Sequence, residues 1–305
     1  MHLSHGYTTD GLRSYTAPRR LAMDNEKDIK QICAVIRNFL NYVLAHGVCP
    51  EYTTDILAAR KVCELAEKEL WEIVQLVQML PGDFNVAAST LYGGRYAGIY
   101  VGDQAWAVND DARGFVAVDQ GFSVLEAERI VKTAIAFAGS NDMFLQAMEP
   151  DIKIVKTETK KYEVVGIERA SIKTIEEYSR VHGVGSRAAY IKPLGVFHVK
   201  DWEGPGLEEE DMTDDEDSEH SEKSKPLADP VIEAYWVEDE ILQHFFIGLK
   251  LELQVQELNI GVKFFDSIIG VYCSFHLALP NELVIEHWKE PRKSCYVLDG
   301  DVKLT

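Results

Sequence analysis

The sequence has few cysteines, no long uncharged run and no pattern typical of a secretory leader, and each of these argues against a class of protein. The cysteines are odd in number and widely spaced, which indicates reduced thiols in a nuclear or cytosolic compartment rather than a disulfide framework. The longest run without Asp, Glu, Lys or Arg covers residues 267–281, which is too short and too polar to span a bilayer. No apolar core follows a basic flank at the N-terminus, so a cleaved signal peptide is not expected. The five cysteines are Cys33, Cys49, Cys63, Cys273 and Cys295.

Familiar catalytic patterns are missing as well. No Gly-x-Ser-x-Gly elbow is present to seat a serine nucleophile, and the Gly-rich stretch 93–98 lacks the Lys-Ser/Thr ending of a phosphate-binding loop. His287 and Cys295 are only weak evidence for a thiol dyad, because nothing else in the sequence supports one. The sequence therefore assigns no catalytic residue and no cofactor.

Four residues offer the ligand types of a zinc site. Cys33, His46, Cys49 and Cys63 lie in one region, but their spacing is unlike that of a familiar zinc finger. Cys33 and Cys63 also fall on the apolar sides of two predicted helices, where a free cysteine packs as a small hydrophobe. We therefore favour a packing role and assign no metal.

The net charge of −19 is concentrated in one tract. Residues 203–222 hold eleven acidic residues and no Lys or Arg, and removing these charges leaves −8 for the remainder of the chain. That remainder shows no broad basic face of the kind that grips phosphates. Direct, sequence-independent RNA binding is therefore not expected.

The acidic tract has two interpretations. It is either a solvated, disordered insert that only aids solubility, or a polyanion that docks on a basic surface of a partner, such as a nucleic-acid channel or a histone tail. Under the second interpretation its central acids are candidate partner-binding residues. These are Glu208, Glu209, Glu210, Asp211, Asp214, Asp215, Glu216 and Asp217.

Aromatic residues around the Gly-rich turns are further candidates for partner binding. Tyr and Trp are favoured at interfaces because they bury a large area at little cost in rotamer entropy. Tyr92, Tyr96 and Trp106 are the three that we select.

Hydrophobic periodicity predicts helices in the first half of the chain. Apolar residues recur at three- and four-residue steps over residues 29–43 and again over 56–80, where Pro81 stops the pattern. The short linker between these segments predicts an antiparallel helical hairpin. A capping box predicts a further helix over residues 123–139.

From residue 150 onward the period changes from 3.6 to 2, which predicts strands. Leu249, Leu251, Leu253 and Val255 alternate with polar residues, as in a half-buried antiparallel strand. The expected strands cover residues 162–167, 191–199, 249–256, 271–279 and 283–288, the last two as a hairpin.

The predicted fold class is α+β, with an N-terminal helical hairpin and a further helix packed with a mainly antiparallel β-rich C-terminal half. We expect an extended arm over residues 1–24, a mainly helical region over 25–150 and a β-rich region over 151–305. A disordered acidic loop is expected at about 203–228.

Three strings in the first third of the chain resemble a known family. They are His-Gly-Val-Cys-Pro-Glu-Tyr (46–52), Glu-Leu-Trp (69–71) and Leu-Pro-Gly-Asp-Phe-Asn-Val-Ala-Ala-Ser-Thr-Leu-Tyr-Gly-Gly (80–94). They are similar to the conserved block of the first Argonaute-binding subunit of the fungal Argonaute siRNA chaperone complex. The similarity is densest over residues 38–106. Some members of that family carry a long basic N-terminal extension, which this chain is expected to lack.

The resemblance implies a non-catalytic adaptor. Such a subunit, together with a second Argonaute-binding subunit, holds Argonaute charged with duplex siRNA. It restrains slicing or passenger-strand release and acts in siRNA-directed heterochromatin formation. Contact with the siRNA would be indirect, through Argonaute, and the protein would work in nucleus and cytoplasm without a membrane. A histone- or chromatin-binding module that uses the acidic loop, and an unrecognised enzyme, remain the alternatives.

Overall fold

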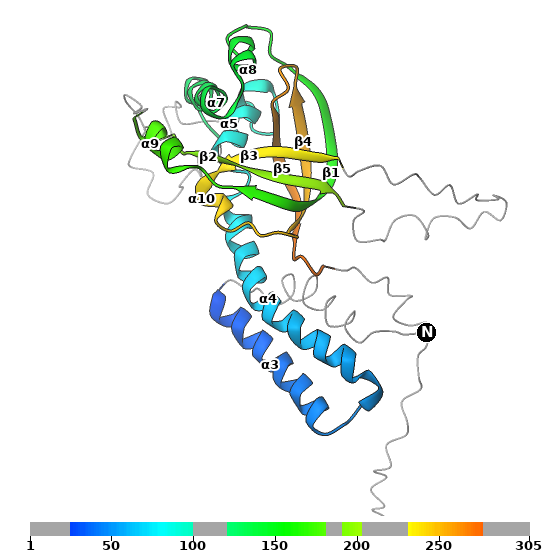
Figure 1. Cartoon of the computed structure of the whole chain (residues 1–305). Helices are drawn as coiled ribbons and strands as arrows, with labels where there is room; N and C mark the ends of the chain where they lie inside the picture. Colours follow the sequence, from blue (N-terminus) through cyan, green and yellow to red (C-terminus); the bar gives the residue numbers. More distant parts are fainter. Residues whose placement is uncertain (1–24, 100–120, 181–190, 203–230, 277–305) are drawn as a thin grey trace, which may run out of the picture.

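The computed structural model describes residues 25–99, 121–180, 191–202 and 231–276. Within these ranges a helical hairpin lies at one end of the molecule and a curved sheet with further helices at the other (Figure 1). The helices are α3 (Glu26–Ala45), the 3-10 turn η2 (Pro50–Tyr52), α4 (Thr53–Met79), α5 (Asp83–Tyr92), α7 (Val124–Ala138), α8 (Asn141–Gln146), α9 (Ile172–Arg180) and α10 (Asp239–Leu242). The strands are β1 (Ile154–Glu168), β2 (Leu194–Asp201), β3 (Ile232–Glu238), β4 (Lys250–Leu258) and β5 (Lys263–Tyr272).

The helical hairpin forms as the periodicity predicts. Asn25 caps α3 by accepting a hydrogen bond from the Asp28 N–H, and Gly47 adopts a left-handed conformation just after the helix. The facing sides of α3 and α4 pack into two small clusters. One holds Ile29, Cys33, Ala66, Leu70 and Cys273, and the other holds Leu40, Ile56, Ala59 and Cys63. Each large side chain that is buried in this way stabilises the pair by about 1.5–3 kcal/mol.

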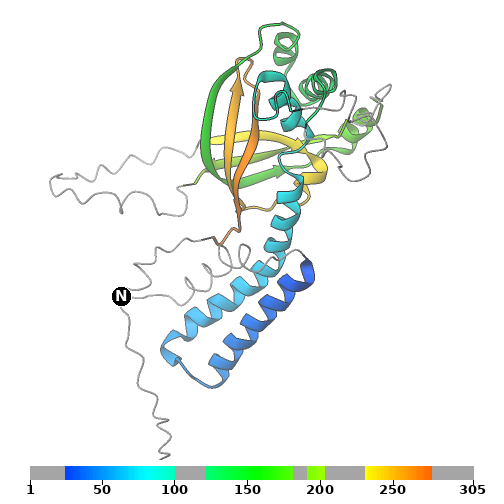
Figure 2. The same cartoon turned by 180° about the vertical axis from the view of Figure 1, so that it is seen from behind.

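The sheet has five strands in the order β3-β2-β1-β4-β5, and every neighbouring pair is antiparallel. The predicted α+β class is therefore confirmed. The central strand β1 pairs with both β2 and β4, with register shifts that mark bulges between Val164 and Gly166 and between Ile154 and Lys156. Bulges increase local twist, which fits the strong curvature of the sheet seen from both sides (Figures 1 and 2).

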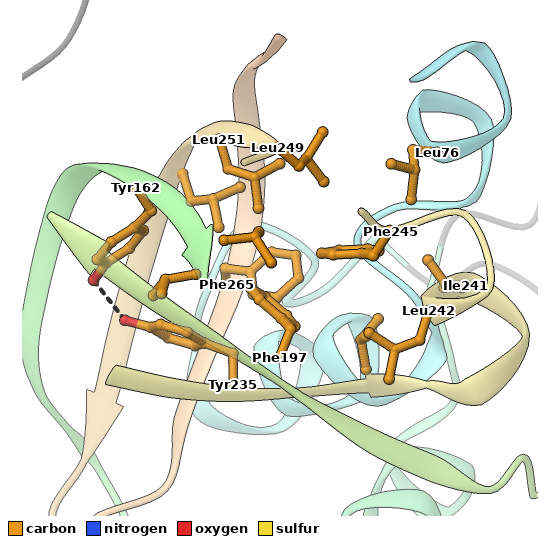
Figure 3. Close-up of a cluster of buried hydrophobic side chains, with 14 of the residues drawn as sticks. Leu76, Tyr162, Phe197, Tyr235, Ile241, Leu242, Phe245, Leu249, Leu251 and Phe265 are labelled. Carbon is orange, nitrogen blue, oxygen red and sulfur yellow. Dashed lines mark hydrogen bonds between the residues drawn. The ribbon is translucent and has the colours of Figure 1, made fainter. Parts of the chain in front are cut away.

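The concave side of the sheet holds the largest buried cluster of the described chain (Figure 3). Tyr162, Phe197 and Phe265 point into it from three strands, and the Tyr162 and Tyr235 hydroxyls form a hydrogen bond of 2.7 Å. Leu76 enters the same cluster from the C-terminal half of α4. The helical hairpin is thus joined to the sheet through a shared core.

The curvature brings the two edge strands of the sheet together. Lys263 of β5 lies 2.6 Å from Glu233 of β3, an ion pair between the first and the fifth strand of the sheet order. Helix α5 packs beside this junction. Asn85, which is fully buried, accepts from the Phe265 N–H of β5 at 3.1 Å and donates to the Trp236 carbonyl of β3 at 3.2 Å. One amide therefore satisfies backbone groups of both edges, which would otherwise lack partners.

Some predicted elements differ from those observed. The segment expected as a strand over 271–279 overlaps only the end of β5, and the rest of that hairpin lies outside the described residues. β3, α5, α8 and α9 were not predicted. α5 is hidden from a periodicity analysis because it spans only ten residues and carries two buried polar side chains, Asn85 and Ser89. The acidic loop and the N-terminal arm also lie outside the described residues.

Strand β4 is more deeply buried than its alternation predicts. Its apolar side is buried as expected, but Lys250 and Gln256 on the other side are also buried, at 9% and 5% exposure. Lys250 donates to the His276 carbonyl, and the amide nitrogen of Gln256 donates to Asp266, so each of these two donors has a partner inside the fold. The half-buried interpretation is therefore wrong at Lys250 and Gln256, whereas Glu252 and Gln254 between them are partly exposed, as it predicts.

Candidate partner-binding surface

Two of the predicted partner-binding residues lie at the end of α5 and in the loop that follows it. Tyr92 is the last residue of α5, and Tyr96 belongs to residues 93–99, which we call the α5 loop. α5 begins at a tight turn in which Gly82 has φ 88° and lies so close to Glu238 that a Cβ atom would collide with its carboxylate. α5 ends at Gly93, which is left-handed. Both ends of the helix are thus fixed by glycines of the string that carries the family resemblance.

A buried carboxylate holds the α5 loop against the sheet. Asp266 of β5 is 1% exposed, and its Oδ2 accepts from Ser89 Oγ at 2.8 Å, from the Arg95 N–H at 2.8 Å and from Gln256 Nε2 at 2.7 Å. Ser89 Oγ in turn accepts from the Tyr96 N–H at 3.0 Å. Hydrogen bonds to a charged acceptor are stronger than neutral ones. The first four residues of the loop are therefore positioned by side chains of the core.

The α5 loop presents a mixed polar and apolar surface. Arg95 is exposed and donates to Ser267 Oγ at 3.0 Å, and Ile99 is 39% exposed. Tyr92 and Tyr96 are half-buried. Burial, with a smaller effect from Glu128, raises the pKa of Tyr92, so its phenol stays protonated. Rigid presentation of amphipathic side chains reduces the entropy lost on binding, so this loop is a candidate contact surface for a partner.

The other predicted contact residues are not brought into this site by the described structure. Trp106 and the acids Glu208, Glu209, Glu210, Asp211, Asp214, Asp215, Glu216 and Asp217 lie outside the described residues. Tyr92 and Tyr96 were selected from the sequence, but Ser89 and Asp266, which hold the backbone at Tyr96 and Arg95, were missed. The sequence did contain one indication of a polar contact on α5. Asn85 and Ser89 are polar, and their spacing of four residues within a small apolar run places them on one side of a helix.

A second buried carboxylate holds the start of α5. Glu238, 2% exposed, accepts from the Phe84 N–H at 2.6 Å and so caps the helix from the end of β3. Burial raises the pKa of Glu238 to about 7, although the hydrogen bond from Phe84 opposes the shift. Nearby, Lys192 pairs with Asp83 at 2.9 Å and with Glu240 at 2.6 Å. A cavity of about 10 Å³ beside Glu238 and Tyr178 has room for a single water molecule.

A third polar junction fixes α4 to the sheet. Glu69 of α4 is buried and accepts from the N–H and the hydroxyl of Ser274 at 2.8 and 2.7 Å. One turn later, Glu72 lies 2.7 Å from His244. Burial and the charge of Lys250 lower the pKa of the nearby His276 to about 4, so this ring is neutral at pH 7. Together these contacts set the direction in which the helical hairpin leaves the sheet.

The residues weighed as zinc ligands do not form one site. Cys33 and Cys63 belong to separate buried clusters, and His46 is exposed with its ring 4.3 Å from that of Tyr42. Among the described residues, no group of three or more His, Cys, Asp or Glu side chains is arranged to hold a metal ion. Within the same ranges, no helix has the length and apolar character needed to cross a membrane.

Comparisons with known proteins agree with the resemblance in the sequence. The Argonaute-binding protein 1 of Schizosaccharomyces pombe is 31% identical over 94 residues, a match that covers 31% of this chain and 24% of that relative. The chain thus matches about a quarter of the length of this curated protein. No solved structure matches. The model of the family described as Argonaute siRNA chaperone (ARC) complex subunit Arb1 matches residues 7–291. Because this match covers almost the whole sequence, the chain belongs to the Arb1 family of ARC complex subunits.

Proposed function

We propose that this chain is a non-catalytic adaptor that binds Argonaute loaded with duplex siRNA. Together with a second Argonaute-binding subunit, it restrains slicing or passenger-strand release in siRNA-directed heterochromatin formation, in nucleus and cytoplasm. The observation that carries the proposal is the family match over residues 7–291, since the family is described as a subunit of an Argonaute siRNA chaperone complex. The printed name of the relative, an Argonaute-binding protein, supports the same partner.

Two segments are proposed to contact the partners. The α5 loop offers Tyr96 and Arg95 on a backbone that Asp266 and Ser89 hold in place. The acidic tract within residues 203–222 is proposed to dock on a positively charged surface of Argonaute. In this arrangement the protein reaches siRNA through Argonaute, because its charge is negative and repels phosphates.

Co-purification with Argonaute and the second subunit tests the proposal. The full chain is compared with Tyr96→Ala and with a variant whose residues 203–222 are replaced by a Gly/Ser linker, at moderate and high salt. Ile172→Ala is the matched control, because Ile172 is a 78% exposed side chain on α9, outside the α5 loop.

The outcomes separate the parts of the proposal. Recovery of Argonaute by the full chain and by Ile172→Ala, with a reduced yield for Tyr96→Ala, supports the adaptor role and the loop contact. Loss of recovery with the Gly/Ser linker, stronger at moderate than at high salt, supports docking of the acidic tract. If the folded full chain recovers no Argonaute but binds basic histone peptides, the adaptor proposal is wrong and the chromatin-binding alternative replaces it.

A further inference from the structure

One side of α3 carries large apolar side chains that the described residues leave open to solvent. Val35, Phe39 and Tyr42 are 62%, 63% and 58% exposed, and their steps of four and three place them on one side of the helix. We call this set the α3 stripe, and it consists of Ile32, Val35, Ile36, Phe39 and Tyr42. A groove runs along its first part, lined by Asp28, Gln31, Ile32, Val35 and Ile36.

The α3 stripe is additional to the side of α3 that packs on α4. Ile29, Cys33 and Leu40 are already buried in the hairpin, so the apolar arc of α3 is wider than one partner helix covers. Apolar side chains grouped in this way are typical of a surface that another segment covers. The question is which segment covers it.

The described chain ends at a cluster that also includes the first residue of the α3 stripe. Phe275 packs against the cluster that contains Ile29 and Cys33, and Ile32 of the stripe packs against the same cluster. The next residue, His276, is held by the hydrogen bond of 3.0 Å that its carbonyl accepts from Lys250. The last described residues therefore lie against the helical hairpin, at the cluster to which the N-terminal part of α3 also contributes.

The sequence that follows has the length and chemistry to cover the stripe. From Ile32 to Tyr42 the stripe runs about 15 Å, which roughly five extended residues span, and residues 277–305 follow His276. The first part of this segment is strongly apolar and contains a single acidic residue before Glu286. Its large apolar residues are Leu277, Leu279, Leu283, Val284, Ile285 and Trp288. The family match also continues through residue 291, beyond the described fold.

We propose that the C-terminal segment 277–305 docks on the α3 stripe, which makes the stripe an intramolecular interface. The proposal does not depend on the Argonaute-binding role. It concerns this chain alone and is tested without partners.

Hydrogen exchange on the isolated full chain tests the proposal. We expect amides at residues 32–43 of α3 to exchange about tenfold faster or more when residues 277–305 are deleted, because at least one large side chain loses its cover. Phe39→Asp in the full chain gives the same increase and adds nothing further in the truncated chain. Asn38→Asp is the matched control, since it adds the same charge one residue away on an exposed position and changes neither protein.

A second variant guards against a truncated chain that fails to fold. The full chain with Leu283→Asp and Ile285→Asp keeps its length, and the proposal requires the same faster exchange in α3. If α3 exchanges equally in the wild type and in both variants, the proposal is overturned. Three other outcomes would assign the stripe to another occupant. Loss of protection only when residues 1–24 are deleted would indicate the N-terminal segment, and protection that rises with protein concentration would indicate a second copy of the chain. Protection that appears only when Argonaute and the second subunit are added would indicate one of these partners.

Discussion

Asn85 offers the sharpest test of how the fold is closed. Its amide bonds three backbone groups: it accepts from the Phe265 N–H, and it donates to the carbonyls of Pro81 and Trp236. Asn85→Ala leaves all three without a partner in a fully buried place. Each unsatisfied buried group costs about 1–3 kcal/mol, and relaxation of the surrounding structure recovers part of the sum. We therefore expect the free energy of unfolding to fall by about 3–5 kcal/mol. That is a large part of the 5–15 kcal/mol that is typical of a whole domain.

Asn259→Ala is the matched control for this prediction. Asn259 also makes two side-chain hydrogen bonds to backbone, to Lys153 N at 3.2 Å and Asp151 O at 2.8 Å, but it is exposed. Water can replace those hydrogen bonds, so we expect Asn259→Ala to lower the free energy of unfolding by less than about 1 kcal/mol. Urea unfolding followed by circular dichroism measures both free energies of unfolding.

Asn85→Asp separates hydrogen bonding from side-chain volume. It keeps the size of the side chain and the acceptor for Phe265, but it removes both donors and adds a charge that faces two carbonyls. We expect it to be destabilised more at pH 8 than at pH 4, where the carboxyl is protonated. If Asn85→Ala costs no more than Asn259→Ala, or if Asn85→Asp is as stable as the wild type at pH 8, our account of the closure is refuted.

Two further predictions concern the pH dependence of stability. Burial raises the pKa of Glu238 to about 7, so its stabilising contribution is full below pH 4.5 and is lost as the pH rises through 7. The free energy of unfolding, measured in urea, should therefore differ less between pH 5 and pH 8 for Glu238→Gln than for the wild type. An equal difference in both proteins would contradict the raised pKa. Burial opposes ionisation of Glu233, but Lys160 and Lys263 outweigh it and lower its pKa to about 2, so its contribution is present above pH 4.5 and is lost between pH 4.5 and 2. Acid titration of Glu233→Gln should show less loss of stability in that window than the wild type, and an identical acid profile would argue against the ion pairs that join Glu233 of β3 to Lys160 of β1 and Lys263 of β5.

The helical hairpin and the class of the fold could be predicted from the sequence because their signals are local. The seam of α3 repeats every three or four residues from Ile29 to Leu40, and the buried side of β4 repeats every two residues from Leu249 to Val255. Such periods follow from the geometry of one element and need no knowledge of its partner.

The closure of the sheet and the support of the α5 loop could not be predicted in this way. Ser89 and Asp266 are 177 residues apart in sequence, and Asn85 and Phe265 are 180 apart, so nothing local indicates that they meet. The burial of Gln256 was missed for another reason: its partner Asp266 is only ten residues away on the neighbouring strand, but alternation within one strand does not show which polar side chains of two strands meet. Tyr92 and Tyr96 were found by residue type alone, and their part in binding stays a prediction.

The position of α5 has a consequence for how the protein behaves in concentrated solution. Unpaired strand edges are templates on which another molecule can add a strand, and natural proteins keep such edges covered. Here one short helix lies against both edge strands and occupies their free backbone groups through Asn85. A fluctuation that detaches α5 would uncover two templates at once. The combined strength of the contacts that hold α5, through Asn85, Ser89 and the Phe84 N–H, therefore also affects the resistance of the protein to aggregation.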